Sequence, residues 1–228
     1  ELLITDELII DGDLNGDGIP DITVQRDATA ADFRIFNIDD GNGSVDKPII
    51  MDGLTITGGN LPAINGSTTD DKGAGIFTQE NLNLLNSNVS GNTAGDRGGG
   101  INGYANYVTD SLTITVTNST ISNNTAPSGG GIYIYNGEGD TTITVTNSTI
   151  SNNTADFQGG GIAAYSEYGN INITLTDTTV TGNSARDGGG IGSETSDGDS
   201  IVIVTNSIIS GNTAEWNGGG IYSYSDYG

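Results

Sequence analysis

The residues with the clearest chemical potential form an acidic run near the start of the chain. It reads Asp11-Gly-Asp13-Leu-Asn15-Gly-Asp17-Gly-Ile19-Pro-Asp21. Calcium binds roughly six to eight oxygen ligands, and alternating acidic and amide side chains around a Gly turn can supply them. The run therefore predicts a calcium site. Its expected ligands are the side chains of Asp11, Asp13, Asn15, Asp17 and Asp21 and the carbonyl group of Ile19.

The same run also fits a simpler structural role. Calcium loops of this type can be read from Asp13 or from Asp11, and neither register ends in a bidentate glutamate, because Val24 or Ile22 stands there. Pro20 and the apolar flanks exclude the helices of an EF-hand. Asp, Asn and Gly are also the residues that tight turns favour. An acidic hairpin turn without metal is therefore the alternative.

Composition narrows the classes of partner and reaction. The chain has 228 residues, with 29 Asp and Glu against 6 Lys and Arg, and a formal net charge of -23. Such a surface repels nucleic acid and anionic lipid, so we expect neither as a partner. The chain has no Cys and no His, which excludes disulfides, Cys or His metal sites and His-dependent triads. No apolar run reaches the roughly 20 residues that a membrane span needs, so we expect no membrane span in this stretch.

A repeat of about 30 residues organises most of the chain. Its marker is a Gly triplet followed by Ile, and one looser copy precedes the regular ones. The copies lie at 73–76, 98–101, 129–132, 159–162, 188–191 and 218–221. A second marker, Asn-Thr-Ala or a close variant, interleaves with the first. Units repeated at this period stack on their neighbours, because one unit cannot bury its own apolar face.

Within each unit the apolar residues alternate with a period of two. Residues 113–117, 142–146 and 172–176 alternate Thr or Asn with Ile, Val or Leu, while Ile121 and Ile132 mark two further short strands. No stretch has the period of an amphipathic helix. We therefore predict an all-β fold, a single-stranded parallel β-helix with about 30 residues and three short strands per coil. Parallel crossovers are right-handed in ~98% of cases, so we expect right-handed winding.

Gly and Asn stand where the strands of each coil must turn. Gly permits positive φ or close approach of two backbones. Asn tolerates the left-handed conformation and can also stack as an amide ladder from coil to coil. We assign this ladder to Asn92, Asn124, Asn153, Asn183 and Asn212.

An aromatic column follows the Gly triplets. Three positions after the motif Ile stand Tyr104, Tyr135, Tyr165, Glu194 and Tyr224, and three positions later stand Tyr107, Tyr168 and Tyr227. Neighbouring coils lie ~4.8 Å apart, so these rings would stack as a ridge. Sugars bind such ridges through their apolar faces, which makes the column tyrosines candidate ligand-binding residues. The alternative is ring stacking that only stabilises the sheet.

Two other features suggest functions that we favour less. Outward Thr residues at 113–117, 142–146 and 174–176 are similar to the flat face of ice-binding solenoids, but the rows break at Asn83 and Ile201. From their places in the repeat, the carboxylates of Glu138, Glu167, Glu194 and Asp197 are expected to lie near one edge. A glycosidase pair at ~5–9.5 Å is therefore conceivable. No coil carries a singular insertion, which argues against an active site.

The regular repeats do not extend over the whole chain. Residues 73–228 repeat clearly, whereas 1–72 form degenerate N-terminal coils that include the acidic turn. The strands expected there cover 3–4, 8–10, 22–24, 33–36 and 54–56, and an insertion near 57–72 is left open. We expect a single domain over 1–228 without a linker. The chain opens at Glu1 and stops inside a motif at Gly228, which predicts a fragment of a larger protein.

The repeat also carries a family resemblance. Ile-Ser-Asn-Asn-Thr-Ala at 121–126, followed by Gly-Gly-Gly-Ile-Tyr at 129–133, resembles the repeat of chlamydial polymorphic outer-membrane proteins and related bacterial surface proteins. Those repeats usually carry Phe-x-x-Asn and Gly-Gly-Ala-Ile, where this chain has Ile121 and Gly131. The opening at 8–18 is similar to that of large repetitive surface proteins of free-living bacteria. The resemblance covers most of the chain and implies a right-handed β-helix that is extracellular, on the bacterial outer membrane or secreted.

Together these features predict an extracellular structural or adhesive β-helix module that is non-catalytic and stabilised by calcium. A carbohydrate-binding or polysaccharide-degrading β-helix is the alternative, and an ice-binding solenoid or a filament-forming subunit is less favoured. The expected partners are glycans or other surface proteins. Exposed strand edges at both ends would also permit end-to-end self-association.

Overall fold

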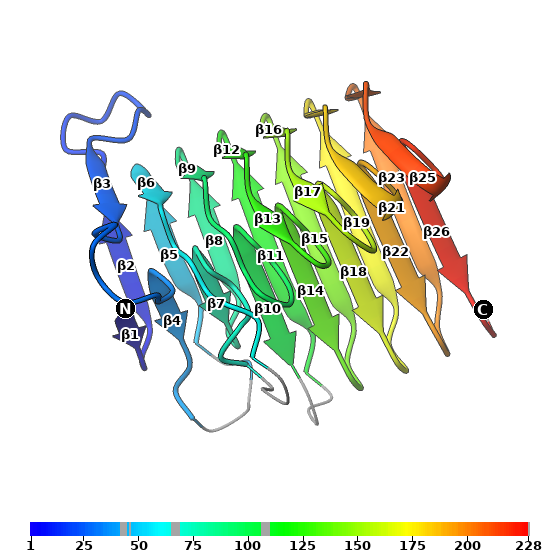
Figure 1. The fold of residues 1–228 in the computed structure, drawn as a ribbon, viewed down its shortest axis with the longest axis horizontal. Helices are drawn as coiled ribbons and strands as arrows, with labels where there is room; N and C mark the ends of the chain where they lie inside the picture. Colours follow the sequence, from blue (N-terminus) through cyan, green and yellow to red (C-terminus); the bar gives the residue numbers. More distant parts are fainter. Residues whose placement is uncertain (42–44, 46, 65–68, 106–109, 228) are drawn as a thin grey trace.

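The chain forms a solenoid of about seven stacked coils (Figure 1). The structure is a computed structural model, and it describes residues 1–41, 45, 47–64, 69–105 and 110–227. All paired strands run parallel, each to the equivalent strand of the coils on either side. Within these described ranges every regular element is a strand and no helix occurs. The predicted single-stranded parallel β-helix is confirmed.

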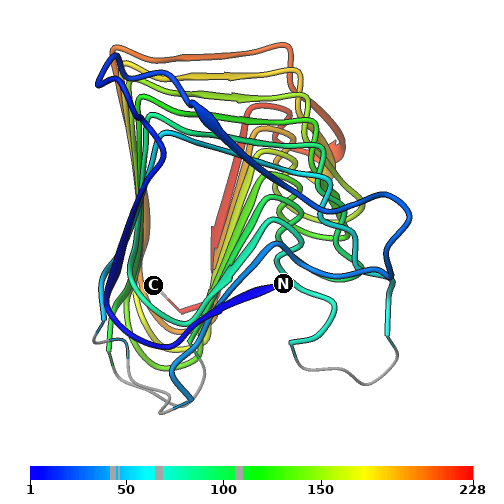
Figure 2. The same cartoon turned by 90° about the vertical axis from the view of Figure 1, so that its left-hand side faces the viewer.

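Three sheets run along the length of the solenoid and form its three long sides (Figure 2). Sheet A contains β1 (Leu2–Ile4), β4 (Phe36–Ile38), β7 (Ile76–Thr78), β10 (Ile101–Ala105), β14 (Ile132–Asn136), β18 (Ile162–Ser166), β22 (Ile191–Thr195) and β26 (Ile221–Ser225). Sheet B contains β2 (Leu8–Asp11), β5 (Ile49–Asp52), β8 (Leu82–Leu85), β11 (Leu112–Thr117), β15 (Thr141–Thr146), β19 (Ile171–Thr176) and β23 (Ser200–Thr205). Sheet C contains β3 (Ile22–Gln25), β6 (Leu54–Thr57), β9 (Asn88–Ser90), β12 (Thr120–Ser122), β16 (Thr149–Ser151), β20 (Thr179–Thr181) and β24 (Ile208–Ser210).

A fourth, short strand that was not predicted is added in the later coils. Sheet D contains β13 (Thr125–Ala126), β17 (Thr154–Ala155), β21 (Ser184–Asp187) and β25 (Thr213–Asn217). These strands are formed by the Asn-Thr-Ala marker, which is too short to show alternation in the sequence. The segment after each of them leads back to the Gly triplet that opens sheet A.

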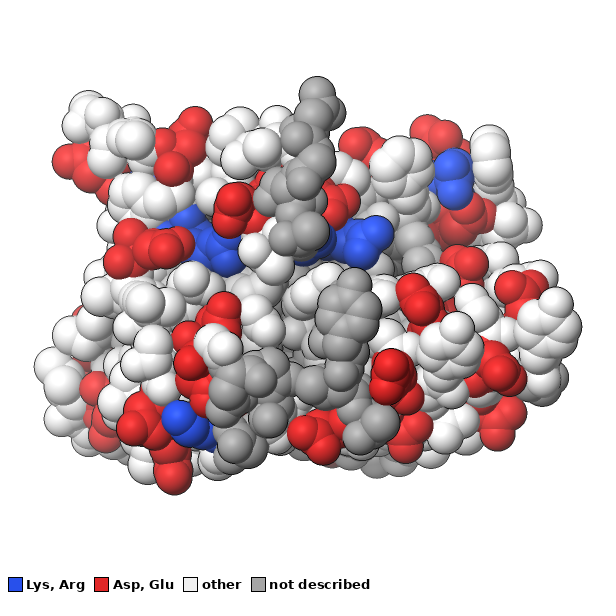
Figure 3. All heavy atoms as spheres, turned by 90° about the horizontal axis from the view of Figure 1, so that it is seen from below, with Lys and Arg blue, Asp and Glu red and all other residues white. Residues whose placement is uncertain are grey.

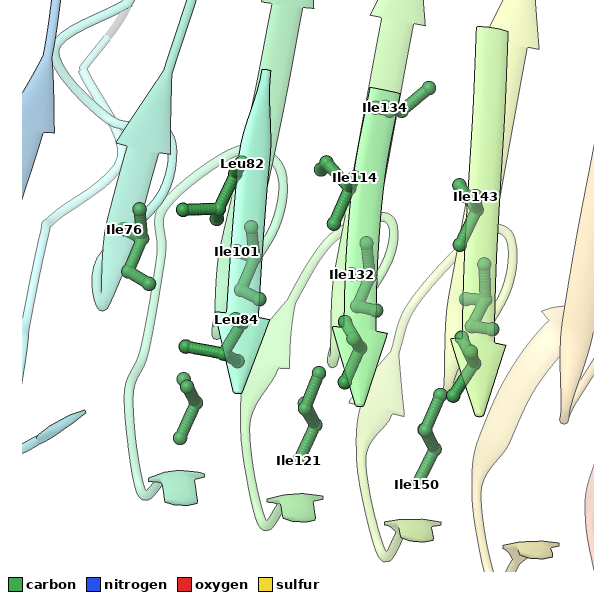
Figure 4. Close-up of a cluster of buried hydrophobic side chains, with 14 of the residues drawn as sticks. Ile76, Leu82, Leu84, Ile101, Ile114, Ile121, Ile132, Ile134, Ile143 and Ile150 are labelled. Atoms are coloured by element: carbon green, nitrogen blue, oxygen red, sulfur yellow. The ribbon is translucent and has the colours of Figure 1, made fainter. Parts of the chain in front are cut away.

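The core is a set of apolar columns that continue from coil to coil. Ile101, Ile132, Ile162 and Ile191 pair in register on sheet A, and all four are fully buried. Figure 4 shows Ile101 and Ile132 among the inward side chains of neighbouring coils. Each fully buried Ile contributes roughly 1.5–3 kcal/mol relative to an exposed one. In the last coil the equivalent Ile221 is partly exposed, because no described coil covers it.

The Gly triplets permit the sharp corner that precedes sheet A. Gly188 has a positive φ of 62°, which side chains rarely adopt. A Cβ atom added at Gly190 would lie 2.5 Å from the carbonyl oxygen of Gly220 in the next coil. The first Gly of the triplet thus turns the chain at the corner, and the last Gly allows the backbones of two neighbouring coils to pass closely.

The N-terminal coils follow the same path with less regular sequences. Strand β4 begins at Phe36, later than predicted, and Phe33 instead forms an isolated antiparallel bridge to Asn60. Strand β5 was missed, because its Ile-Ile-Met-Asp run does not alternate. The insertion left open near 57–72 is a long connection between β6 and β7, and 65–68 of it lie outside the described residues.

Candidate functional site

The predicted calcium run forms the loop between β2 and β3. The carboxylate of Asp13 accepts hydrogen bonds from the backbone N–H groups of Gly16 at 2.8 Å and Gly18 at 2.8 Å. Asn15 Oδ1 accepts the N–H of Asp17 at 2.9 Å. Hydrogen bonds from backbone N–H groups, that of Gly18 above all, lower the pKa of Asp13. The loop is therefore organised around the ionised carboxylate of Asp13.

The other predicted ligands lie on the same loop but accept separate hydrogen bonds. Asp11 Oδ1 accepts the N–H of Asp13 at 3.1 Å, and Asp21 Oδ2 accepts that of Leu14 at 2.9 Å. The N–H of Ile19 donates to Asp17 Oδ1 at 2.9 Å. In the part of the chain that the structure describes, no three acidic side chains are grouped so that they could hold a metal ion. Calcium binding therefore stays a prediction.

The five Asn residues assigned to a ladder form one column at the corner that follows sheet C. Along the column each side-chain amide donates to Oδ1 of the Asn in the next coil, at 2.9–3.0 Å. The same Oδ1 atoms accept backbone N–H groups at 2.9–3.0 Å. Asn153 Nδ2 also donates to the carbonyl of Ile121 at 3.0 Å. The column thus pairs buried amides along the solenoid.

The left-handed conformation that we expected of these Asn residues does not fall on them. It falls one residue earlier, as at Asn123 (φ 56°) and Asn152 (φ 54°), and at the corner between sheets B and C, as at Asn118 (φ 51°) and Asn147 (φ 47°). The chain turns at these outer positions. The ladder residues instead aim their amides along the corner at the next coil.

Three of the predicted column tyrosines stand together on the outer face of sheet A. Tyr104, Tyr135 and Tyr165 are in register, with ring centroids 5.3 Å and 5.8 Å apart and planes inclined by 20° and 8°. The rings stack on one another, so their edges rather than their faces meet the solvent. Glu194 takes the next place and separates Tyr165 from Tyr224. The predicted ridge of stacked rings is therefore present over these three coils, and sugar binding by it stays a prediction.

The remaining predicted tyrosines lie apart from this stack. Tyr224 is 6.5 Å from Tyr222, within its own strand, and the two planes are inclined by 4°. Tyr168 and Tyr227 are exposed near the turn that leaves sheet A. Tyr107 lies outside the described residues.

The tyrosine stack forms one wall of a groove of about 640 Å³. The groove is also lined by residues of the segment that precedes the Gly triplets, among them Lys72, Arg97 and Arg186. Since the chain has 6 Lys and Arg, half of them line this groove. In Figure 3 most basic side chains lie in a strip along the length of the molecule, with acidic side chains on either side.

The cations at the N-terminal end of the groove lie over aromatic rings. Lys72 Nζ is 5.5 Å from the centroid of the Tyr104 ring, and the Arg97 guanidinium is 5.1 Å from that of Tyr133. Asp96 lies between the two cations, with Oδ2 at 3.3 Å from Lys72 Nζ and Oδ1 at 3.7 Å from Arg97 Nε. Cation–π contacts add roughly 0.5–1 kcal/mol at exposed sites and about 2 kcal/mol when desolvated, and Lys72 is buried.

Arg186 forms an aromatic sandwich at the C-terminal end of the groove. Its guanidinium lies 5.3 Å from the ring centroid of Phe157 and 4.6 Å from that of Trp216. Phe157 is 50% exposed and Trp216 70% exposed. Sequence reasoning did not predict this group, although the three residues occupy the same place before successive Gly triplets. That equivalence was the signal that could have revealed them.

Two carboxylates in the groove differ in their surroundings. Burial, followed by repulsion from Asp226 and Asp187, raises the pKa of Glu194. Glu167 Oε1 accepts a hydrogen bond from the Tyr135 hydroxyl at 2.8 Å. The raised pKa lets Glu194 keep its proton to a higher pH than an ordinary carboxyl group, which is a property of general acids.

The predicted Thr rows lie on sheet B, and the predicted exposed edges lie at the two ends of the solenoid. The Thr residues at 113–117 and 142–146 pair in register on sheet B, and Ile201 ends the row beside Asn172. At the two ends of the solenoid, strand edges are unpaired in the described part, and apolar side chains that end the inward columns, such as Leu8 and Ile221, are partly exposed. End-to-end association stays a prediction.

Comparison with known families supports the same architecture. The model of a right-handed β-helix region matches residues 38–180, and the model of the Chlamydia polymorphic membrane protein repeat matches residues 206–224. Neither a curated protein nor a solved structure matches the chain significantly. No helix that could cross a membrane is present among the described residues.

Proposed function

The chain belongs to the right-handed β-helix family, and from this premise we propose that it is a non-catalytic adhesive module of a bacterial surface protein. The match to the polymorphic membrane protein repeat supports a place on a surface protein. The groove on sheet A would hold a glycan chain. A rigid solenoid suits this role because each coil adds the same length and the same face to the binding surface.

The groove is the observation that carries this proposal. It runs beside the tyrosine stack, and the Arg186 sandwich at its edge leaves Trp216 70% exposed. An exposed aromatic face beside hydrogen-bonding groups is the arrangement on which a sugar ring can stack. Glu167, Glu194 and Gln158 would supply hydrogen bonds to its hydroxyl groups.

Glycan binding is tested by screening the protein against a panel of polysaccharides and measuring the dissociation constant of the best one. Replacing Trp216 with Ala should weaken that binding by about tenfold, equivalent to about 1.4 kcal/mol of lost stacking. Ile208→Ala is the matched control, because Ile208 is exposed in the same coil but lies on sheet C. After prolonged incubation we expect no shortened chains.

Three outcomes would count against this proposal. Binding to no polysaccharide of the panel would remove the adhesive role of the groove. An equal loss in Ile208→Ala would show that the bound surface lies elsewhere. Shortened products that disappear in Glu194→Gln would favour the alternative of a polysaccharide-degrading β-helix.

We further propose that calcium orders the loop between β2 and β3. Asp13, Asn15 and Asp17 present their oxygen atoms within five residues, and a carboxylate that accepts backbone N–H groups still has lone pairs for a cation. At 100 times its dissociation constant a ligand stabilises the fold by ~2.7 kcal/mol. For a chain of this size the shift in Tm is roughly 5–10 °C.

Thermal unfolding in calcium and in excess chelator measures this effect. Asp13→Asn should remove most of the calcium-dependent shift. Asp177→Asn is the control, because it removes the same charge as Asp13→Asn. The fold accepts Asn at this corner, since Asn147 and Asn206 occupy the equivalent place in neighbouring coils. Equal Tm values with calcium and with chelator would leave an acidic turn without metal.

A further inference from the structure

A second cavity opens beside the groove, at the C-terminal end of the tyrosine stack. Its volume is about 270 Å³. It is lined by Tyr165, Glu167, Tyr168, Ser196, Asp197 and Tyr227. Three aromatic rings and two carboxylates therefore surround it, and no Lys or Arg is among its described lining residues. We call it the C-terminal cavity.

Tyr165 contributes an open ring face to this cavity. One of its faces is covered by Tyr135, whose ring centroid is 5.8 Å away. On the other side Glu194 replaces the next Tyr of the column, so no ring of a described residue stacks there. The Tyr165 hydroxyl lies 3.2 Å from Ser196 Oγ, a hydrogen bond that fixes the orientation of the ring.

The other two rings come from equivalent positions of coils that lie on either side of Asp197. The backbone N–H of Asp197 donates to the carbonyl of Glu167 at 3.0 Å, which sets the two carboxylate-bearing segments side by side. Tyr168 is 64% exposed and Tyr227 84% exposed, so both rings can close around a ligand without moving buried groups.

The electrostatics of the cavity favour a cation. No ion pair formed by the described residues includes Glu167 or Asp197. Glu167 and Asp197 lie in the neighbouring turns that follow β18 and β22, and the whole chain has a net charge of -23. An anion would be repelled, and a neutral ligand would leave both carboxylates without a counter-charge.

We propose that the C-terminal cavity binds an organic ammonium group. Aromatic faces attract alkylammonium ions through the ring quadrupole, and quaternary ammonium ions are bound in cages of such rings. The two carboxylates complement the positive charge. The group could be the primary amine of an amino sugar or the quaternary amine of a choline head group. The site does not depend on the glycan proposed for the groove.

Titrations followed by NMR or calorimetry test this site with two matched pairs of small ligands. Choline is compared with its neutral isostere, in which a tert-butyl group replaces the trimethylammonium group, and glucosamine with N-acetylglucosamine. We expect at least one ammonium ligand to bind about tenfold or more tightly than its neutral partner. Added salt should weaken this binding. The pair that shows the preference identifies a quaternary or a primary amine as the ligand.

Variants then locate the binding. Asp197→Asn and Tyr168→Ala should each weaken the ammonium ligand by about tenfold or more, and both side chains lie at the surface of the fold. Asp177→Asn removes the same charge from a distant corner and should leave binding unchanged. Equal binding of the charged and neutral partners, or an equal loss in Asp177→Asn, would overturn the proposal. If Trp216→Ala lost glycan binding but kept ammonium binding, the result would bear on the groove and not on the C-terminal cavity.

Discussion

Replacing Asn153 with Ala should lower the free energy of unfolding by about 3–5 kcal/mol. Asn153 is fully buried in the middle of the ladder. Its Oδ1 accepts both the backbone N–H and the side-chain amide of Asn124, each at 3.0 Å. Its own amide donates to Asn183 Oδ1 and to the carbonyl of Ile121, each at 3.0 Å. Ala would leave two donors of Asn124, which is itself fully buried, without the acceptor that Asn153 Oδ1 provides.

The measurement is urea unfolding of the wild type and the variant, followed by circular dichroism. Asn172→Ala is the matched control, because Asn172 lies on the outer side of β19, where its register partners are Thr142 and Ile201. We expect that control to change the free energy by less than about 0.5 kcal/mol. Similar losses in the two variants would mean that the ladder contributes no more than an ordinary surface Asn.

Replacing Gly190 with Ala should destabilise the protein by about 3 kcal/mol or more. The added Cβ would lie 2.5 Å from the carbonyl oxygen of Gly220, so the backbones of two coils would have to separate. That carbonyl also accepts the N–H of Ile191 at 2.9 Å, so the shift would disturb a ladder hydrogen bond as well. The effect should appear as a lower Tm and a lower urea midpoint.

The last coil offers a matched control for this substitution. Gly220 occupies the same place in its Gly triplet, but a Cβ atom there would meet only the Ile209 side chain, at 3.4 Å. We expect Gly220→Ala to change stability by less than about 1 kcal/mol. If it destabilised the protein as much as Gly190→Ala does, backbone approach between coils would not explain the requirement for Gly.

These two positions show how the repeat stabilises itself. Asn153 and Gly190 each lie against the same residue type in the next coil, so the same stabilising contact recurs from coil to coil. Stability in such a solenoid is close to a sum of unit and interface terms. A substitution in the middle therefore affects the interfaces on both sides, whereas one in the last coil affects fewer contacts.

The sequence by itself determined the architecture and much of its chemistry at the corners. The Gly triplets, the alternation on sheet B and the Asn column were all readable, because in a parallel solenoid each residue lies beside its own repeat one coil away. The period of two within a unit then identifies a strand, and the repeat length identifies the strand that lies beside it. The acidic loop was also located correctly between two strands, since Asp, Asn and Gly determine a tight turn locally. Its metal stays a prediction.

Only the tertiary structure decided what the outer face of sheet A presents. The register predicted the tyrosine column, but ring orientation depends on the neighbouring side chains, and the stacked rings cover each other's faces. The break at Glu194 leaves one Tyr165 face open, and the Arg186 sandwich joins one side chain from each of three coils, two of them aromatic. The groove and the C-terminal cavity arise where side chains from different coils and different segments meet. Such contacts depend on rotamers and on the path of the connecting loops, which no local pattern specifies.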